Sequence, residues 1–279
     1  MDLIGAFPPA LVLLLLVLVV VLAVAVAVWV LLPGFLGADA ARRNLGSHRL
    51  ELGAWLTVIV LNALITLPLT LTPFLHIEQG LTTGTFVVAA LSTDIPMLVI
   101  LYIRVIRPGA LSWSDLGLRP LPLDYTLRMG LAAGLGGLVA IDVIGTFLSQ
   151  FGLRPNQLEQ FQFVLSEGPL SFAVLLVAAA IVAPFFEELF FRGFLFGIYR
   201  RKQPGWLAYL VSSVLFTILH LEPNRMNLSQ MAGLSAGIFL LALLLAWVYE
   251  HTGSLYPGMI AHAINNATGL ILFYSFGLR

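Results

Sequence analysis

The chain has 279 residues, of which 59% are hydrophobic and 10% are charged, and its mean hydropathy is +0.98. About a quarter of the residues in soluble globular domains are charged, so the composition excludes that class and predicts an all-α, polytopic membrane helix bundle. Zero formal net charge without a basic block argues against a nucleic-acid partner. The absence of cysteine excludes disulfides, thiolate metal sites and cysteine nucleophiles.

Eight apolar runs are long enough to be considered as membrane spans, although the sixth is short. The first lacks the positively charged flank of a cleavable signal peptide, so we expect a retained helix that faces lipid. The predicted spans are 9–32, 52–74, 84–106, 127–150, 170–199, 205–220, 228–249 and 255–276.

Basic loops indicate the orientation, because Arg and Lys concentrate on the cytoplasmic side of a membrane. We expect three basic loops to be cytoplasmic and both termini to lie outside, while the Glu250–His251 turn is placed inside by parity alone. The basic residues in question are Arg42, Arg43, Arg49, Arg107, Arg119, Arg200, Arg201 and Lys202.

The chain is predicted to divide into three parts. Residues 1–107 hold the N-terminal transmembrane helices and carry no motif, residues 108–125 form a connector, and residues 126–279 form a transmembrane core. Within the connector, 108–122 predicts an interfacial segment whose Ser or Asp caps a short helix. Residues 156–168 are expected on the outer surface.

The span 170–199 contains two adjacent carboxylates and an arginine, Glu187, Glu188 and Arg192. Ionisable groups at bilayer depth are costly and are retained where they face a bundle interior or a cavity. Glu188 and Arg192 are four residues apart, in the favourable order for an ion pair on one helix face. That pairing leaves Glu187 as a candidate general base, because burial and a like-charged neighbour both raise a carboxyl pKa. A purely structural ion pair is the alternative.

Two later helices carry further polar groups. His220 ends one span before the helix-ending Glu222-Pro223, and His262 and Asn266 lie four apart on another. Counted at about 1.5 Å per residue from the cytoplasmic helix ends, Glu187 lies roughly 20 Å deep, His220 roughly 22 Å, His262 roughly 10 Å and Asn266 roughly 16 Å. One pocket can therefore collect them, although a helix-end histidine and an interhelical hydrogen-bonding pair are the structural alternatives.

Such a pocket supports two kinds of chemistry. Glu187, His220 and His262 can bind Zn²⁺ or another divalent metal and leave a position for water. Alternatively, Glu187 and His220 activate water directly, while His262 and Asn266 hydrogen-bond a developing oxyanion. The residues alone do not choose between these.

The three motifs Glu187-Glu188-x-x-x-Arg192, Phe216-x-x-x-His220 and His262-x-x-x-Asn266 resemble those of the CPBP family, which comprises CAAX prenyl endopeptidases and Abi-type bacteriocin-processing or immunity proteins. The stretch Trp113–Pro120 is similar to a connector of bacterial members. The resemblance implies a glutamate-dependent intramembrane endopeptidase, usually classed as a metalloprotease, in a prokaryotic plasma membrane. It implies that Glu187 and His220 activate water, that Glu188 and Arg192 support them, and that His262 and Asn266 complete the site.

Other polar groups permit other interpretations. Gly233-Leu-Ser235-Ala-Gly237 matches a serine-nucleophile pattern, but that motif needs a strained turn, and here close helix packing is expected. Asp94 and Asp142 are intramembrane acids that suit an ion path, and we expect both to pack inside the bundle. No H-E-x-x-H motif of ordinary zinc proteases occurs.

We therefore predict an intramembrane endopeptidase that cleaves a membrane-associated or lipid-anchored protein with glutamate-activated water and metal assistance. The bilayer and a membrane-anchored protein or peptide are the expected partners. The alternative is a non-catalytic immunity protein, scaffold or transporter that keeps the polar cluster for structure or ion passage.

Overall fold

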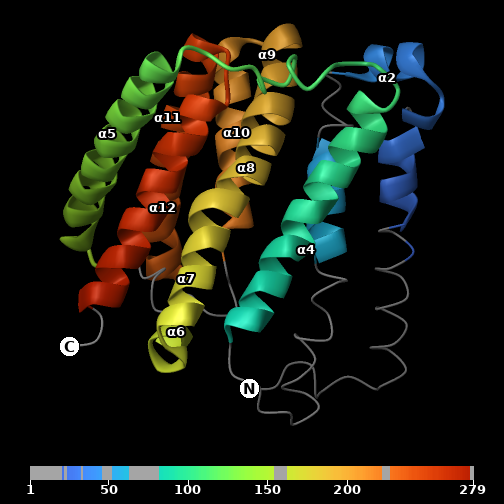
Figure 1. The fold of residues 1–279 in the computed structure, drawn as a ribbon. Coiled ribbons are helices and arrows are strands. Elements are labelled where there is room, and N and C mark those ends of the chain that lie inside the picture. Colours follow the sequence, from blue (N-terminus) through green and yellow to red (C-terminus); the bar gives the residue numbers. More distant parts are fainter. Residues whose placement is uncertain are drawn as a thin grey trace, which may run out of the picture.

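A computed structural model describes residues 21, 24–32, 34–45, 52–62, 82–153, 162–221 and 227–276, and the predictions for 9–20, 63–74, 156–161 and Glu222-Pro223 lie outside them. Helices joined by turns make up these residues, and they contain no strand, so the predicted helical bundle is confirmed (Figure 1). The helices are α2 (Ala38–Asn44), α4 (Thr83–Leu101), η1 (Tyr102–Ile106), α5 (Leu123–Ser149), α6 (Gln162–Glu167), α7 (Pro169–Val177), η3 (Ala178–Val182), α8 (Ala183–Glu187), η4 (Glu188–Phe196), α9 (Gly197–Lys202), α10 (Gly205–Leu219), α11 (Leu228–Thr252) and α12 (Tyr256–Phe276).

Four helices in the described ranges are long and apolar enough to cross a membrane: Thr83–Ile106, Leu123–Ser149, Pro169–Lys202 and Leu228–Thr252. The helices Leu52–Asn62 and Gly205–Leu219 are apolar but shorter. α12 is long enough, but a histidine and two adjacent asparagines lower its hydropathy. The protein is a multi-pass helical membrane protein, and the predicted count of eight spans is not confirmed.

The helices of the C-terminal half form one bundle in which α5, α11 and α12 lie side by side, and the long helix from α7 to α9 runs next to them (Figure 1). Glycines let α5 approach α12 closely. A Cβ atom on Gly130 would lie 2.7 Å from Ile260, and one on Gly134 would lie 2.8 Å from Ile264. α8 contacts α12 and also packs against α4. The residues at the end of α8 therefore lie between α4 and α12.

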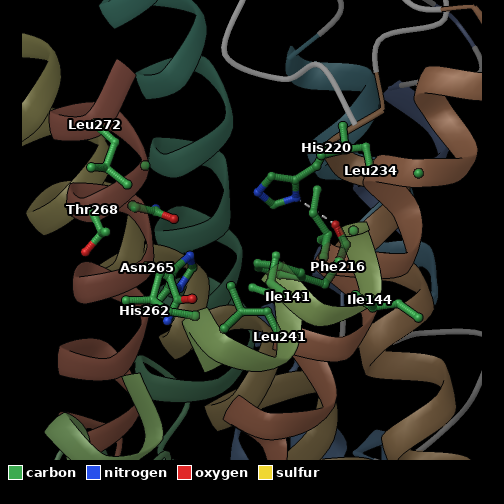
Figure 2. A pocket seen from close by; sticks show the side chains of 17 residues that line it. Ile141, Ile144, Phe216, His220, Leu234, Leu241, His262, Asn265, Thr268 and Leu272 are labelled. Atoms are coloured by element: carbon green, nitrogen blue, oxygen red, sulfur yellow. Dashed lines mark hydrogen bonds between the residues drawn. The ribbon is translucent and has the colours of Figure 1, made fainter. Parts of the chain in front are cut away.

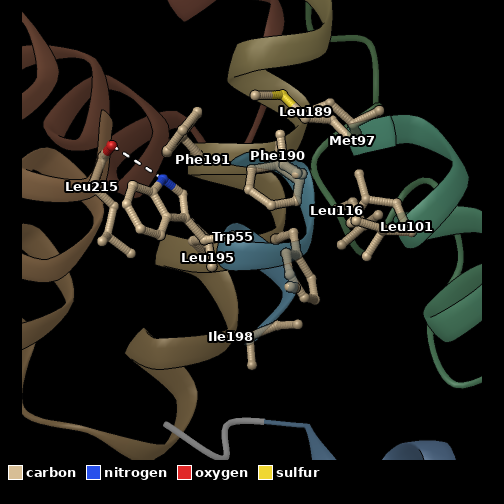
Figure 3. Close-up of a cluster of buried hydrophobic side chains, with 14 of the residues drawn as sticks. Trp55, Met97, Leu101, Leu116, Leu189, Phe190, Phe191, Leu195, Ile198 and Leu215 are labelled. Carbon is tan, nitrogen blue, oxygen red and sulfur yellow. Dashed lines mark hydrogen bonds between the residues drawn. The ribbon is translucent and has the colours of Figure 1, made fainter. Parts of the chain in front are cut away.

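A buried apolar cluster joins the N-terminal helices to this bundle (Figure 3). Phe190, Phe191 and Leu195 of η4 pack with Trp55 of the helix Leu52–Asn62 and with Leu101 of α4. The indole Nε1 of Trp55 donates a hydrogen bond to the carbonyl oxygen of Leu215 at 3.2 Å. The helix that carries the paired glutamates is thus held by packing on the side away from α12.

Side chain to main chain bonds tie the predicted basic loops together at one end of the bundle. Arg42 donates to the carbonyl of Gly109 at 2.8 Å, Arg201 to that of Asp115 at 3.2 Å, and Lys202 to that of Leu45. Arg119 donates to the carbonyl of Gly253, next to the Glu250–His251 turn, at 2.8 Å. These loops therefore share one end of the molecule, as the orientation prediction requires.

The local predictions for the connector, for Ser235 and for the two intramembrane acids have different outcomes. The connector at 108–122 forms turns rather than the short helix expected, although Ser112 and Asp115 do bond each other as in a helix cap. Ser235 lies inside α11 and donates to the carbonyl of Met231, so the serine-nucleophile turn is absent there. Asp94 is buried as expected, whereas the expectation for Asp142 was wrong, because that residue lies on an exposed face of α5.

Candidate active site

Glu187 and Glu188 lie at a junction between α-helical and π-helical backbone. Glu187 is the last residue of α8, and Glu188 begins the nine-residue π-helix η4. A second π-helical turn, η3, precedes α8. Single π-helical turns within α-helices occur frequently at functional sites. Successive side chains on a helix of 3.6 residues per turn point about 100° apart, so the two neighbouring glutamates make separate sets of contacts.

Asn266 of α12 bonds the π-helical turn. Pro184 has no N–H, so the π-helical hydrogen bond that would run from residue 184 to the carbonyl of Ala179 cannot form. Asn266 Nδ2 donates to that carbonyl oxygen at 2.7 Å instead. The proline in α8 thus fixes where α12 meets the helix that carries the glutamates.

Glu188 is completely buried and holds two partners with one oxygen. Its Oε1 lies 3.0 Å from Arg192 Nη1 and accepts a hydrogen bond from His262 Nδ1 at 3.0 Å. The guanidinium carbon of Arg192 lies 4.3 Å from the centre of the Phe216 ring. Gly258 leaves room for the carboxylate, because a Cβ there would lie 3.1 Å from Glu188 Oε2. The predicted pairing of Glu188 with Arg192 is present.

Glu187 faces both histidines. Its Oε1 lies 3.7 Å from His220 Nε2, and its Oε2 lies 3.6 Å from His262 Nε2. Both distances exceed that of a hydrogen bond. His220 Nδ1 donates to the carbonyl of Phe216 at 2.8 Å, and His262 Nδ1 donates to Glu188. In the neutral form of each ring, Nε2 is therefore the nitrogen without a proton, and it lies toward Glu187.

The histidines and asparagines line a cavity of about 390 Å³ between α5, α10, α11 and α12. Figure 2 shows His262 and Asn265 on one side of it and His220 with Phe216 on the other. Leucine, isoleucine and glycine residues of α5 and α11 form most of the remaining wall. Glu187 is not among the lining residues, but both imidazole rings contact it. Of the predicted polar groups, His220, His262 and Asn266 thus line the cavity, and Glu187 lies immediately beside it.

A second cavity, of about 450 Å³, lies between α4 and α7 with η3. Its lining is apolar except for Asp94, whose side chain is 3% exposed. Asp94 belongs to α4, which packs against α8, the helix that ends at Glu187. This cavity therefore contains a single acid that lies outside the three motifs.

The predicted metal set of Glu187, His220 and His262 fits a divalent metal by its chemistry. Two imidazole nitrogens and a carboxylate are common zinc donors, and each ring donates its other N–H to an oxygen, as metal-binding histidines do. Within the described residues, however, no group of three or more His, Cys, Asp or Glu side chains is arranged to hold an ion.

Asn265 is a polar residue at this cavity that sequence reasoning missed. Its side chain is 8% exposed, and its Nδ2 donates to the carbonyls of Ala261 and Gly134. The sequence signal for it is its position three residues after His262, because residues three apart share one helix face. In the structure this face of α12 meets the glycines of α5.

Residues 169–268 match the family model of type II CAAX prenyl endopeptidase Rce1-like proteins. That segment runs from α7 into α12 and contains all six predicted site residues. The putative membrane peptidase YdiL of Bacillus subtilis is 26% identical over 166 residues, which cover 56% of this chain and 64% of that protein. The uncharacterized protein YyaK of the same organism is 36% identical over 131 residues, 44% of this chain and 41% of YyaK. The matches thus span about two fifths to two thirds of these relatives, and no solved structure matches significantly.

Proposed function

Since the chain carries the type II CAAX prenyl endopeptidase Rce1-like family segment at residues 169–268, we propose that the protein is an intramembrane endopeptidase that cleaves a membrane-associated or lipid-anchored protein. One observation supports this best: the Nε2 atoms of His262 and His220 lie 3.6 and 3.7 Å from the carboxylate oxygens of Glu187, beside a cavity. Neither contact is a direct hydrogen bond, so the carboxylate remains able to bind a water that lies beside the rings.

In this mechanism Glu187 accepts a proton from the water as its oxygen attacks the carbonyl carbon of the substrate. The same carboxyl then donates the proton to the leaving amide nitrogen as the carbon–nitrogen bond breaks. Glu188 keeps the His262 ring in one orientation through Nδ1. Asn266 has a second N–H beside the one bonded to Ala179, and this N–H is available to an oxyanion.

A divalent metal is compatible with the proposal. Glu187, His220 and His262 would hold it, and it would polarise a carbonyl and acidify a bound water. Elemental analysis of purified protein, with chelator treatment and the His262→Ala variant, distinguishes the metal-assisted mechanism from the metal-free one. A stoichiometric metal that is lost with His262 supports the metal version, whereas full activity of metal-free protein refutes it.

The proposal is tested by Glu187→Gln, which keeps the shape of the side chain and removes the base. We expect cleavage of a reconstituted peptide substrate to fall by at least about a hundredfold. The matched control is Glu167→Gln, which changes an exposed glutamate outside the site. Comparative proteomics of membrane fractions with wild type or Glu187→Gln identifies substrate termini that depend on Glu187. Cleavage by Glu187→Gln at the wild-type rate would exclude the mechanism.

A non-catalytic transport or scaffold function is the second candidate, because Asp94 is a buried acid in a cavity outside the three motifs. Such acids mark ion paths in membrane proteins. If an ion flux or phenotype is lost in Asp94→Asn and retained in Glu187→Gln, this function replaces the endopeptidase.

A further inference from the structure

The cavity that the two histidines line lies closer to one end of the bundle than to the other. On α5 its lining runs from Leu138, fifteen residues after the helix begins, to Gly145, four residues before it ends. On α11 it runs from Gly233, five residues after the helix begins, to Leu241, eleven residues before it ends. At about 1.5 Å per residue, the lining of these two helices comes within about 6–8 Å of one end of the bundle and stays about 16–23 Å from the other.

The nearer end is the one opposite the basic loops. Figure 1 shows α2 and α9, which carry basic residues, at one end and α6 at the other. The connector with Arg119, which bonds Gly253 after α11, leads into the first residues of α5. The last turn of α5 therefore lies away from the basic loops, and there the Ser229 hydroxyl at the start of α11 donates to the carbonyl of Gly152. Because Arg and Lys concentrate on the cytoplasmic side, we expect the cavity in the outer half of the membrane.

Packed apolar side chains fill the bundle between the cavity and the basic end. Leu241 lines the cavity and also belongs to a buried cluster of α5, α11 and α12. Leu245 and Val248, which follow Leu241 toward the basic end, are both 0% exposed, and Ala133 of α5 and Ala261 of α12 belong to the same cluster. Interiors packed in this way contain few spaces larger than a water molecule. The cavity is therefore closed toward the basic loops.

The helix that carries His220 is too short to cross the membrane. α10 has 15 residues, which span about 22 Å, whereas the hydrocarbon core is about 30 Å thick. It begins three residues after the basic Lys202, so its end lies roughly 8 Å below the outer boundary. There the His220 side chain lines the cavity and is 21% exposed, while Glu188 is 0% exposed. His220 of α10 and Thr268 of α12 face this part of the cavity from opposite sides (Figure 2).

We propose that the cavity opens to the outer face of the membrane and takes its substrate from that side, so that the substrate is a membrane-anchored protein whose cleaved segment lies outside the cytoplasm. This inference rests on the proposed endopeptidase function and adds the substrate class to it. The segment enters between His220 and Thr268 and reaches Glu187 from there. A lipid-anchored tail in the cytoplasm would have to pass the closed, basic end of the bundle.

The test is thiol labelling, for which the chain is suited because it contains no cysteine. Thr268→Cys places a single thiol on the cavity wall. Ile271→Cys is the matched control, because Ile271 lies on the same helix outside the lining and is 46% exposed on the surface of the bundle. A charged methanethiosulfonate that does not cross membranes is added to intact cells. We expect Thr268→Cys to react at least about tenfold faster than Ile271→Cys, because the reactive thiolate forms in water and not in lipid.

Two further variants establish the side and guard against a folding defect. Ser114 is an exposed residue of the connector at the basic end. Ser114→Cys should be labelled in inverted membrane vesicles and not in intact cells, whereas Thr268→Cys should show the reverse preference. Gly269→Cys is a second probe of the cavity wall, because a Cβ there meets nothing within 4 Å. If Thr268→Cys does not fold, Gly269→Cys gives the same comparison.

The outcomes separate this inference from the proposed function, because labelling requires no catalysis. Labelling from outside without cleavage by wild-type protein retains the direction of access and removes the endopeptidase. If the substrate termini that depend on Glu187 lie on the cytoplasmic side, the inference is overturned and the endopeptidase is retained. Labelling of the cavity thiols only in inverted vesicles, labelling from neither side, or labelling of Ser114→Cys in intact cells also overturns it.

Discussion

Replacing each of the two adjacent glutamates by glutamine is expected to have opposite effects on stability and chemistry. Glu188→Gln removes the charge from the oxygen that lies 3.0 Å from both Arg192 and His262. Arg192 is 0% exposed and would be left as a buried cation without its partner. Each contact to a charged group contributes about 1.5–3 kcal/mol, and breaking a buried ion pair costs about 3–5 kcal/mol. Glu188→Gln should therefore destabilise the protein by about 3–5 kcal/mol.

Glu187→Gln is the matched comparison, because it makes the same chemical change one residue away. Its nearest ion-pair contacts lie at 3.6 and 3.7 Å, so we expect a change within about 1 kcal/mol. Thermal unfolding in detergent measures both, and at about 2–4 °C per kcal/mol the Glu188→Gln midpoint should fall by roughly 10 °C. Equal midpoints for the two variants would refute the assignment of the structural role to Glu188.

Three further predictions concern packing and the connector. Gly193→Ala places a Cβ 2.5 Å from a backbone oxygen of the connector and should lower the free energy of unfolding by about 1–3 kcal/mol, measured by thermal unfolding. Gly136→Ala is the control, because its Cβ meets nothing within 4 Å, and it should not destabilise the protein. Similar losses in both variants would refute the close approach at Gly193. Trp55→Phe removes the indole hydrogen bond and should cost about 1 kcal/mol in the same assay, and an unchanged midpoint would contradict this. Hydrogen bonds from the Ser112 amide and hydroxyl lower the pKa of Asp115 below its ordinary value of 3.8, so the connector turn is stabilised above that pH and loses this contribution as the pH falls through the lowered pKa. The protection of the Ser112 amide against hydrogen exchange, relative to its intrinsic rate at each pH, should fall in that range, and Asp115→Asn should abolish this change in protection.

The sequence predicted the helical class, most helix positions in the described ranges and the groups that meet at the site. The i, i+4 spacings of Glu188–Arg192 and His262–Asn266 both place side chains where the structure has contacts. Depth counting was less accurate, since it put His220 and His262 roughly 12 Å apart along the membrane normal, although both lie within 3.7 Å of Glu187. The count assumes straight α-helices of equal tilt, and two π-helical turns interrupt the helix that holds Glu187.

Other features could not be predicted because they depend on the neighbouring helix. The spacing of Asn265 from His262 is as favourable as that of Asn266, and only the close approach of α5 decides what each amide meets. The role of Asn266 as a partner for the Ala179 carbonyl depends on the π-helical turn before Pro184, and no local sequence pattern predicts that turn. For Asp142 the sequence pattern was misleading: an acid within an apolar run predicts a position inside the bundle, but the residue lies on an exposed face of α5.

The bonds that tie the loops at the basic end have a consequence for how freely the chain can vary. In each bond the donor is an Arg or Lys side chain and the acceptor is a main-chain carbonyl, at Leu45, Gly109, Asp115 or Gly253. Every residue type offers that carbonyl, so the bond to Leu45 does not depend on the side chain there, whereas Gly109 and Gly253 have φ angles of 71° and 63°, and a Cβ at Gly253 would overlap the Arg119 guanidinium. The N-terminal helices can therefore vary at residue 45, and a chimera that follows the same backbone path and keeps the buried contacts of Trp55 is expected to keep the glutamates and histidines in place.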